Sequence, residues 1–498
     1  MSLNPLRFLL QLPPLEKAFF LFSAVFHVVA LAYCTGYHHA DEHFQILEFA
    51  AYKLGLCTHE SLAWEYDAGM RSGLQPGIAY LIHQLFFGVS GQHQAFWVSD
   101  TLRLLSVSLG FVSLLWLRML ADAFSLNAIR KQLISAALCL FPLMPYLHAR
   151  FSSENYSSIF AILALMLLFR KGNPQSSTAF SVLFLSGFCW GIGFGFRYQL
   201  GLAALGCGLW LFGVARVGWK RFFVFSTGIL AACFVLLPVD YWLYGKPTFP
   251  PANYLYQTLM KPGHIFGASP WYAYTNLTWE NLVTPLNLVI LGALFWAVLS
   301  MPFSVLSLII TIFIAGHCAI GHKEFRFLFP VFPLILFAAA AYFPLLNKFI
   351  ANDFWARSMR FAGLSLLFTY AAFLNTSIAA VPASPDVNTF RFLWSKTEKR
   401  GTITVYCPYD IGYVMAHYYE FRYFRKPNTN LRFYKNRENL WAQKPQPGSY
   451  VLVWNDQAII DAGQQQSCIF RSDGSLLQWD FLRPQATNTD RYSLFELR

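Results

Sequence analysis

Two adjacent acids, Asp41 and Glu42, stand in the stretch YHHADEHFQ, which directly follows the first long apolar segment of the chain. Adjacent carboxylates suit a general base, because burial can raise the pKa of one carboxyl while the other stays ionised. With His38, His39 and His43 beside them they also suggest a metal-ligand set, although the spacing HHxxxH is no standard zinc pattern. A third interpretation is a solvated helix start, since acids favour a helix N-terminus. Spacing alone leaves all three interpretations open.

A second group of ionisable residues, His322, Lys323 and Arg326, lies in the stretch GHKEFRFLFP, where another apolar segment begins. Ionisable side chains at the end of a membrane span are costly unless they snorkel, pair or bind something. Snorkelling, with a local ion pair to Glu324, is the simpler interpretation. The functional interpretation is a cationic pocket for an anionic lipid head, in which arginine grips the phosphate with two N–H groups and lysine adds a point charge.

Single aromatic and cationic residues stand near other apolar segments: Arg150 in HARFSSEN, Arg197 in GFRYQL, Trp64 and Arg71 in AWEYDAGMRSGLQP, and Trp271 in FGASPWY. Arg150 and Arg197 could merely cap helix ends, and Trp64 could anchor at a membrane interface. Taken together, these side chains suit the binding of a sugar phosphate, because rings stack on the sugar and cations hold the phosphate.

The composition of the chain is that of a membrane protein. Of its 498 residues 56% are hydrophobic and only 12% are charged, whereas soluble chains carry about a quarter charged residues. The net charge of +12 is interpreted as a cytoplasmic excess of Lys and Arg rather than a nucleic-acid footprint. The nine cysteines are scattered singly without a CxxC pair; a disulfide between Cys407 and Cys468 is the one pairing left open.

The apolar segments predict a mostly α-helical, polytopic protein with about eleven transmembrane helices, since a helix needs about 20 mostly apolar residues to cross a bilayer. The expected spans are 18–37, 99–117, 131–149, 156–169, 179–196, 199–215, 222–243, 283–300, 302–320, 326–345 and 359–379. The shorter stretch 76–90 is either an interfacial helix or a twelfth span. The first apolar run lacks a small-residue cleavage site, so it is expected to be retained rather than removed as a signal peptide.

The loops between these spans predict which side of the membrane each faces. Basic loops alternate along the chain, as expected when Lys and Arg stay in the cytoplasm. This alternation places the loop 38–98, which carries the acids, on the other face together with the C-terminal region. A transmembrane domain is therefore expected over 1–383. Residues 384–498 are richer in charge and hold strand-like runs such as TITVYCPY and SYVLVWN, which predict a small soluble α/β domain.

Five motifs taken together resemble those of a known family. HHADEHFQ, WEY followed by RS, YGKPTFPPANYL, FGASPWY and GHKEFRF resemble, in order, the motif series of the GT22 mannosyltransferases, membrane enzymes of the GT-C fold. The match covers roughly residues 30–330 and is nearest to the branch that adds the third mannose in GPI anchor biosynthesis. The chain departs from the pattern at His39-Ala40, where the family has His-Pro, and at Ala63, where Thr precedes the tryptophan. RFSSEN also replaces a run like RTLSNS.

The resemblance implies that mannose is transferred from dolichyl-phosphate mannose to a glycan or glycolipid acceptor, with inversion to an α linkage. It implies Asp41 as the catalytic base, with Glu42 orienting it or the acceptor. The leaving polyprenyl phosphate would meet a cationic group, and further side chains would contact the substrates. The residues that the resemblance implies for binding the donor phosphate are His322, Lys323, Arg326 and Arg197. Those that it implies for contacts with the substrates are Trp64, Arg71, Arg150 and Trp271.

The resemblance leaves several features open. No metal ligand is assigned, although a divalent cation stays open as a cofactor. The membrane is expected to be that of the endoplasmic reticulum in a eukaryote, or the inner membrane in a bacterium. A multi-pass transporter and a GT-C transferase for another lipid-linked sugar are the alternatives. A transporter favours ionisable residues near the middle of its spans, whereas here they lie at the span ends.

Overall fold

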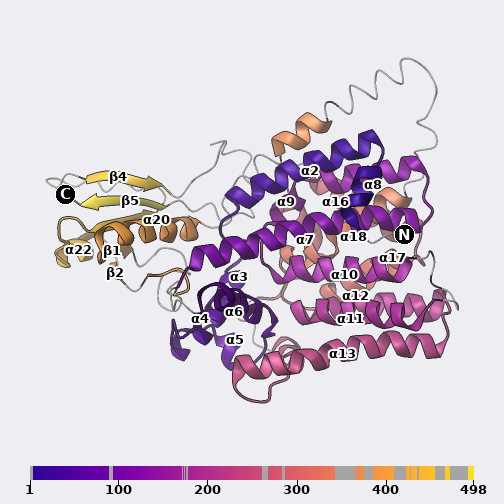
Figure 1. Ribbon diagram of the computed structural model, residues 1–498, viewed down its shortest axis with the longest axis horizontal. Coiled ribbons are helices and arrows are strands. Elements are labelled where there is room, and N and C mark those ends of the chain that lie inside the picture. Colours follow the sequence, from indigo (N-terminus) through magenta and orange to yellow (C-terminus); the bar gives the residue numbers. More distant parts are fainter. Residues whose placement is uncertain are drawn as a thin grey trace.

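The structure is a computed structural model, and most of it is α-helical, as the sequence predicts (Figure 1). Long helices lie side by side, with a cluster of short helices and a small sheet at one end of them. The described residues are 4–88, 93–170, 172, 174, 178–260, 267–282, 286–342, 365, 367–374, 385–408, 422–426, 428–434, 437–454, 466–471 and 492–497.

Among the described residues, four helical segments are long and apolar enough to cross a membrane: α2 (Pro14–Tyr33), α7 (Ala95–Ala123), α13 (Trp219–Tyr244) and the segment Phe325–Tyr342, formed by η6 (Phe325–Val331) and α18 (Phe332–Tyr342). A fifth is counted if α16 (Leu286–Ser300) and α17 (Val305–Ala319), which are bent by 120°, form one broken span. Shorter apolar helices are α10 (Ser153–Phe169), α11 (Phe180–Phe196) and the pair α12 (Leu200–Leu209) and η3 (Trp210–Val214). The chain is an integral membrane protein.

The first ten expected spans each coincide with helical structure. The helices α7, α10 and α13 are longer than expected and α2 has the expected length, whereas α11, α17 and the pair α12 and η3 are shorter. The expected span 131–149 is divided into α8 (Ala128–Leu140) and α9 (Leu143–His148). The division falls at Pro142, since proline lacks a backbone N–H and disfavours a helical residue before it. The expected span 359–379 lies mostly outside the described residues. The total of eleven spans therefore stays a prediction.

Residues 76–87 of the stretch 76–90 lie in α6 (Leu74–Phe87), a helix of 14 residues, and residues 89–90 lie outside the described part of the chain. At 1.5 Å per residue it is about 21 Å long, which is too short for the roughly 30 Å hydrocarbon core of a bilayer. Of the two expected arrangements, the length favours the helix that does not cross.

Small residues bring α11 and α13 into close contact. A Cβ atom added at Gly187 would lie 2.0 Å from the carbonyl oxygen of Phe225, and one added at Gly228 would lie 2.2 Å from that of Phe184. No larger side chain fits at either position without moving the backbone. Such close approach is a common basis of helix association in membranes, where van der Waals packing replaces the hydrophobic effect.

The loop after α2 folds into short helices at one end of the long ones (Figure 1). They are α3 (Ala40–Glu42), the π-helix η1 (His43–Leu47), α4 (Glu48–Lys53), the 3₁₀ turn η2 (His59–Ser61), α5 (Trp64–Asp67) and α6. Two helical elements of a later loop, α14 (Pro250–Leu255) and η4 (Tyr256–Met260), and the helix α15 (Ala273–Asn281) precede α16. A further helix, α1 (Pro5–Gln11), precedes α2.

The C-terminal region contains the α/β structure that its sequence predicts. Its sheet has the strand order β2-β1-β3-β5-β4, with β1 parallel to β2 and β3, and β5 antiparallel to β3 and β4. The elements are α20 (Pro385–Arg400), β1 (Ile403–Pro408), β2 (Thr429–Tyr434), α22 (Arg437–Ala442), β3 (Tyr450–Trp454), β4 (Gln466–Arg471) and β5 (Tyr492–Leu497). The strands expected at TITVYCPY and SYVLVWN are confirmed as β1 and β3.

The disulfide considered between Cys407 and Cys468 is wrong. Cys407 lies in β1 and Cys468 in β4, and two strands, β3 and β5, separate them. Neighbouring strands lie about 4.8 Å apart, so these residues are much farther apart than the roughly 7 Å between Cα atoms that a disulfide can bridge. Cys407 is a buried free thiol.

Candidate active site

Asp41 and Glu42 lie in α3, a single helical turn at the end of the long helices. Its N-cap is His39, whose Nδ1 accepts a hydrogen bond of 3.2 Å from the backbone N–H of Asp41. The chain then continues as the π-helix η1, a rare form that is frequent at functional sites. Consecutive residues in a helix point about 100° apart, so Asp41 and Glu42 contact different partners.

Asp41 forms ion pairs with two arginines. Its Oδ2 accepts a hydrogen bond of 2.8 Å from Arg326 and lies 3.8 Å from a terminal nitrogen of Arg71. Burial opposes ionisation of Asp41, but Arg326, His39 and Arg71 together outweigh it and hold the pKa of this carboxyl well below its usual range. Asp41 is therefore a carboxylate, and 27% of its side chain is accessible.

Glu42 points to a different set of partners. Its Oε2 accepts hydrogen bonds from Nε of Arg150 at 3.1 Å and from the backbone N–H of His38 at 3.3 Å. Burial raises the pKa of the Glu42 carboxyl above its usual value, although Arg150 partly offsets this. Only 7% of the side chain is exposed, against 27% for Asp41.

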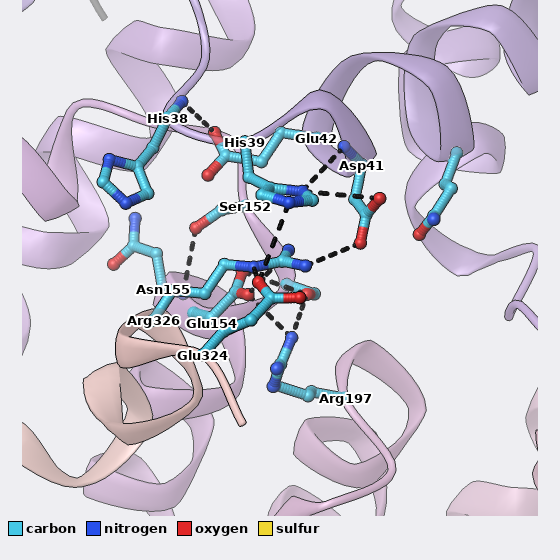
Figure 2. Close-up of polar contacts among 12 residues, drawn as sticks. His38, His39, Asp41, Glu42, Ser152, Glu154, Asn155, Arg197, Glu324 and Arg326 are labelled. Carbon is cyan, nitrogen blue, oxygen red and sulfur yellow. Dashed lines mark hydrogen bonds and ion pairs between the residues drawn. The ribbon is translucent and has the colours of Figure 1, made fainter. Parts of the chain in front are cut away.

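Arg326 joins segments that are far apart in the sequence. Besides Asp41 it contacts Glu324, to which its Nε donates, and Glu154, whose Oε1 lies 3.5 Å from one terminal nitrogen (Figure 2). Glu154 also accepts a hydrogen bond of 2.7 Å from Arg197, which in turn donates to the hydroxyl of Ser153 at 3.2 Å. A single guanidinium thus serves three carboxylates.

A cavity of about 50 Å³, here called the first cavity, opens beside these groups. Its charged lining is three acids and three arginines: Asp41, Glu42, Glu154, Arg71, Arg197 and Arg326. The remaining lining residues are Gln45, Ile46, Ser72, Gln75, Pro76, Ser153, Gly195 and Phe196. Within the described part of the chain, Nε of Arg71 and both Nε and one terminal nitrogen of Arg197 are buried without a hydrogen-bond partner. Unused cationic donors beside a cavity suit an anionic ligand.

The structure separates the expected phosphate-binding cations into two pairs. Arg197 and Arg326 line the first cavity, whereas His322 and Lys323 are not among its described lining residues. His322 lies 2.7 Å from Oε1 of Glu324, and the Lys323 ammonium donates to the backbone carbonyls of Ser269 and Ile320.

The expected substrate-binding residues are also divided. Arg71 lines the first cavity, and Arg150 holds Glu42 from another side. Trp64 and Trp271, with exposed fractions of 43% and 73%, are not among the described lining residues. Their roles stay predictions, as do those of the residues that do line the cavity.

The sequence analysis missed Glu154, Glu65 and Gln45. Glu154, 2% exposed, pairs with two arginines, while Glu65 accepts a hydrogen bond of 2.9 Å from Gln45 and lies 3.8 Å from Arg71. Glu154 could have been found, because it is an acid at the start of an apolar segment and such a position is costly without a partner. Among the described residues no three His, Cys, Asp or Glu side chains are grouped to hold a metal ion.

The folded protein should lose stability at acid pH in part because Glu324 becomes protonated. Burial opposes ionisation of Glu324, but His322 and Arg326 outweigh it and hold its pKa well below the usual value. A depressed folded-state pKa stabilises the fold above the unfolded pKa of about 4.3, and this stabilisation is lost as the pH falls through the folded-state value. Thermal unfolding midpoints of the detergent-solubilised protein should therefore fall between about pH 5 and pH 3 less steeply for Glu324→Gln than for wild type.

The matched control for this experiment is Glu438→Gln, since Glu438 is an exposed acid on α22. Its profile should follow that of wild type. An equally steep loss of stability in Glu324→Gln would show that the acid sensitivity arises elsewhere.

Comparison with known proteins gives one family match and several related sequences. The model of the Alg9-like mannosyltransferase family matches residues 18–407. GPI mannosyltransferase 3 of Candida albicans is 26% identical over 344 residues, which cover 66% of this chain and 65% of that protein. Mannosyltransferase APTG1 of Arabidopsis thaliana is 24% identical over 342 residues, 64% of this chain and 57% of that protein. The chain thus matches somewhat less than two thirds of the length of these relatives.

Solved structures with a similar fold include ArnT from Cupriavidus metallidurans. Its apo structure superposes with a TM-score of 0.54, covering 87% of this chain and 92% of ArnT, at 11% sequence identity. A second ArnT structure, bound to undecaprenyl phosphate, gives a TM-score of 0.52 at the same identity and covers 88% of this chain and 93% of ArnT. At this identity the likeness concerns the fold alone.

Proposed function

The chain belongs to the Alg9-like mannosyltransferase family, and we propose that it transfers mannose from a polyprenyl-phosphate donor to a hydroxyl group of a glycan or glycolipid. The reaction inverts a β-linked donor to an α-linked product. The observation that carries this proposal is the position of Arg326, which contacts Asp41 at a cavity that Arg71 and Arg197 also line.

The first cavity supports a lipid-phosphate donor rather than a nucleotide sugar. It lies at the ends of α10 and α11, two apolar helices, because its lining includes Ser153, Glu154, Gly195 and Phe196. Its arginines offer N–H donors that match the oxygens of a phosphate. ArnT, which has a similar fold, has been crystallised with undecaprenyl phosphate.

The proposed reaction needs no nucleophile from the protein. The acceptor oxygen attacks C1 of mannose as the bond from C1 to the phosphate oxygen breaks. The acceptor proton passes to Asp41, and the bonding electrons leave with the polyprenyl phosphate, whose charge Arg326 and Arg197 stabilise. Fixed cations aimed at the developing charge are often the largest contribution to catalysis.

Donor binding also prepares the base in this mechanism. Arg326 donates to Asp41 and keeps the pKa of its carboxyl low, and a carboxylate with a low pKa is a weak base. A donor phosphate competes for the same guanidinium, so the pKa of Asp41 rises when the phosphate takes over these N–H groups. Glu42, held by Arg150 and the His38 backbone, orients the acceptor.

The proposed location follows from the loops. The short helices α3 to α6 and the C-terminal region lie at one end of the long helices (Figure 1), and we place this end on the non-cytoplasmic face. The membrane is that of the endoplasmic reticulum in a eukaryotic host, or the inner membrane in a bacterial one.

A transfer assay with purified protein and a host membrane extract as the source of acceptor tests the proposal. Labelled polyprenyl-phosphate mannose should yield a labelled glycan or glycolipid, whereas GDP-mannose should yield none. Polyprenyl-phosphate glucose and polyprenyl-phosphate arabinose serve as sugar controls. Transfer from GDP-mannose without a lipid intermediate contradicts the donor class, and a preference for another lipid-linked sugar contradicts the assignment of mannose.

The two pairs of cations should differ in their effect on donor binding. Arg197→Gln removes a guanidinium that lines the first cavity, so the dissociation constant for labelled donor should rise by about 10- to 100-fold, the equivalent of a charged hydrogen bond of about 1.5–3 kcal/mol. Lys323→Ala should raise it by less than about threefold, because the ammonium is engaged by the Ser269 and Ile320 carbonyls. An equal loss of donor affinity in the two variants would show that Lys323 also binds the donor phosphate.

A further inference from the structure

A second cavity of about 50 Å³ shares a lining residue, Glu42, with the first. Glu42 is the only residue common to the described linings of the two cavities. The second cavity lies between α7, the turn before α10, the segment after α2 and the C-terminal region. Two arginines, Arg103 and Arg150, line it.

Arg103 is a buried cation in this lining with unused donors. It is 8% exposed, and one terminal nitrogen donates to Asp100 at 2.9 Å. Its Nε and its other terminal nitrogen are buried and have no hydrogen-bond partner among the described residues. Asp100 also accepts two hydrogen bonds, of 2.6 and 3.1 Å, from Arg391. One carboxylate thus serves two guanidinium groups, which leaves an excess of positive charge.

Arg150 adds a second guanidinium to the same cavity. It is 2% exposed and donates through Nε to Glu42, and one of its terminal nitrogens is buried without a partner in the described part of the chain. Buried polar groups are normally hydrogen-bonded and buried charges paired, because leaving them unsatisfied costs free energy. Two arginines with N–H groups that no described residue accepts, around one cavity, therefore suit the binding of an anion. Their planar guanidinium groups match a phosphate in particular.

We propose that the second cavity binds a phosphate group carried by the acceptor glycolipid, with Arg103 and Arg150 as its ligands. The inference rests on the proposed transfer reaction, in which the first cavity holds the donor phosphate. Inversion requires the acceptor hydroxyl and the leaving phosphate on opposite sides of C1. Two anion sites that share only Glu42 suit such an arrangement, because an acceptor anchored in the second cavity and a donor anchored in the first would reach the acids from different cavities.

Binding of two matched glycosides to the full-length protein tests this. The probes are octyl α-mannoside and the same mannoside carrying one phosphate monoester, measured in nanodiscs of phosphatidylcholine with polyprenyl phosphate present to fill the first cavity. Wild-type protein should bind the phosphorylated probe at least about tenfold more tightly. Arg103→Gln should abolish this difference. The control Arg391→Gln should keep it, because Arg391 shares Asp100 but is not among the described lining residues.

Two outcomes would overturn the proposal. One is an equal preference for phosphate in wild type and Arg103→Gln, which places the phosphate elsewhere. The other is loss of the preference in wild type when the nanodiscs contain phosphatidylglycerol, an anionic lipid without a sugar, which assigns the cavity to a membrane headgroup. The readout is binding rather than transfer, so an error in the proposed sugar or donor would appear in the transfer assay and leave this measurement interpretable.

Discussion

Replacing Asp41 by asparagine should lower the rate of transfer from bound donor by about 10²- to 10⁴-fold, the usual loss when a general base is removed. The substitution keeps the shape of the side chain and removes its ability to take the acceptor proton. Single-turnover transfer, with labelled donor bound beforehand and the acceptor identified in the transfer assay, isolates this step from substrate binding.

Donor affinity should not fall in Asp41→Asn. The Asp41 carboxylate accepts a hydrogen bond of 2.8 Å from Arg326, and a neutral amide would compete less strongly with a phosphate for the same N–H groups. A slow variant that binds donor as well as wild type, or better, is the signature of a base that shares its arginine with the donor.

Glu42→Gln is the matched control, since Glu42 is the adjacent acid and pairs with Arg150 instead. It should slow transfer less and mainly raise the KM for acceptor. If Asp41→Asn is folded and transfers at nearly the wild-type rate, Asp41 is not the base. Glu42, whose pKa burial raises, then becomes the candidate, because a base works best with a pKa nearer the operating pH.

The sequence indicated which residues carry charge at the membrane edge, but not how they pair. Asp41 and Arg326 are 285 residues apart, and their contact depends on how η6, which contains Arg326 and packs against α10, lies beside the turn at α3. The sequence equally suggested Lys323 as a phosphate ligand. In the structure the Lys323 ammonium donates to the backbone carbonyls of Ser269 and Ile320, and Lys323 is not among the described residues that line the first cavity. Hydrogen bonds of this kind, to backbone carbonyls, leave no recognisable pattern in the sequence.

Apolar runs were a good guide to helices and a poorer guide to membrane crossings. Periodicity and length locate a helix, whereas its ends depend on caps and prolines. Asn127 caps α8 and Ser152 caps α10, each through a side-chain oxygen that accepts from a backbone N–H. These caps shift the helices relative to the apolar runs, because apolar residues continue into the turns between them, as at Phe141–Pro142.

The contact between the C-terminal region and the loop after α2 was not predictable from sequence. Phe424 stacks on His43 with ring centroids 5.4 Å apart, and the backbone N–H of Tyr423 donates to Glu48 at 3.0 Å. Phe49 and Phe390 belong to one buried apolar cluster that joins the two regions. A boundary near residue 383 therefore stays a prediction. The C-terminal region supports the π-helix that follows Asp41 and Glu42.

Arg326→Gln should have the largest combined effect of any single substitution at this site. It removes the only described group that contacts Asp41, Glu154 and Glu324 together, and it removes the cation proposed to receive the leaving phosphate. Breaking a buried ion pair by deleting one partner costs about 3–5 kcal/mol, here reduced because Asp41 and Glu324 are partly exposed. Transfer should fall below detection, and the thermal unfolding midpoint should fall as well.

Loss of folding and loss of catalysis can be separated with Glu154. Glu154 is 2% exposed and keeps Arg197 at 2.7 Å when Arg326 is lost, but removing this buried acid together with Arg326 leaves two acids and two arginines around the first cavity, so the charges balance again. The double variant Arg326→Gln, Glu154→Gln should therefore recover part of the thermal stability, while transfer stays undetectable because no guanidinium replaces Arg326 at the phosphate. Recovery of transfer together with stability would mean that Arg326 acts only by neutralising buried acids. The leaving phosphate would then depend on Arg197 and Arg71, the other arginines that line the first cavity.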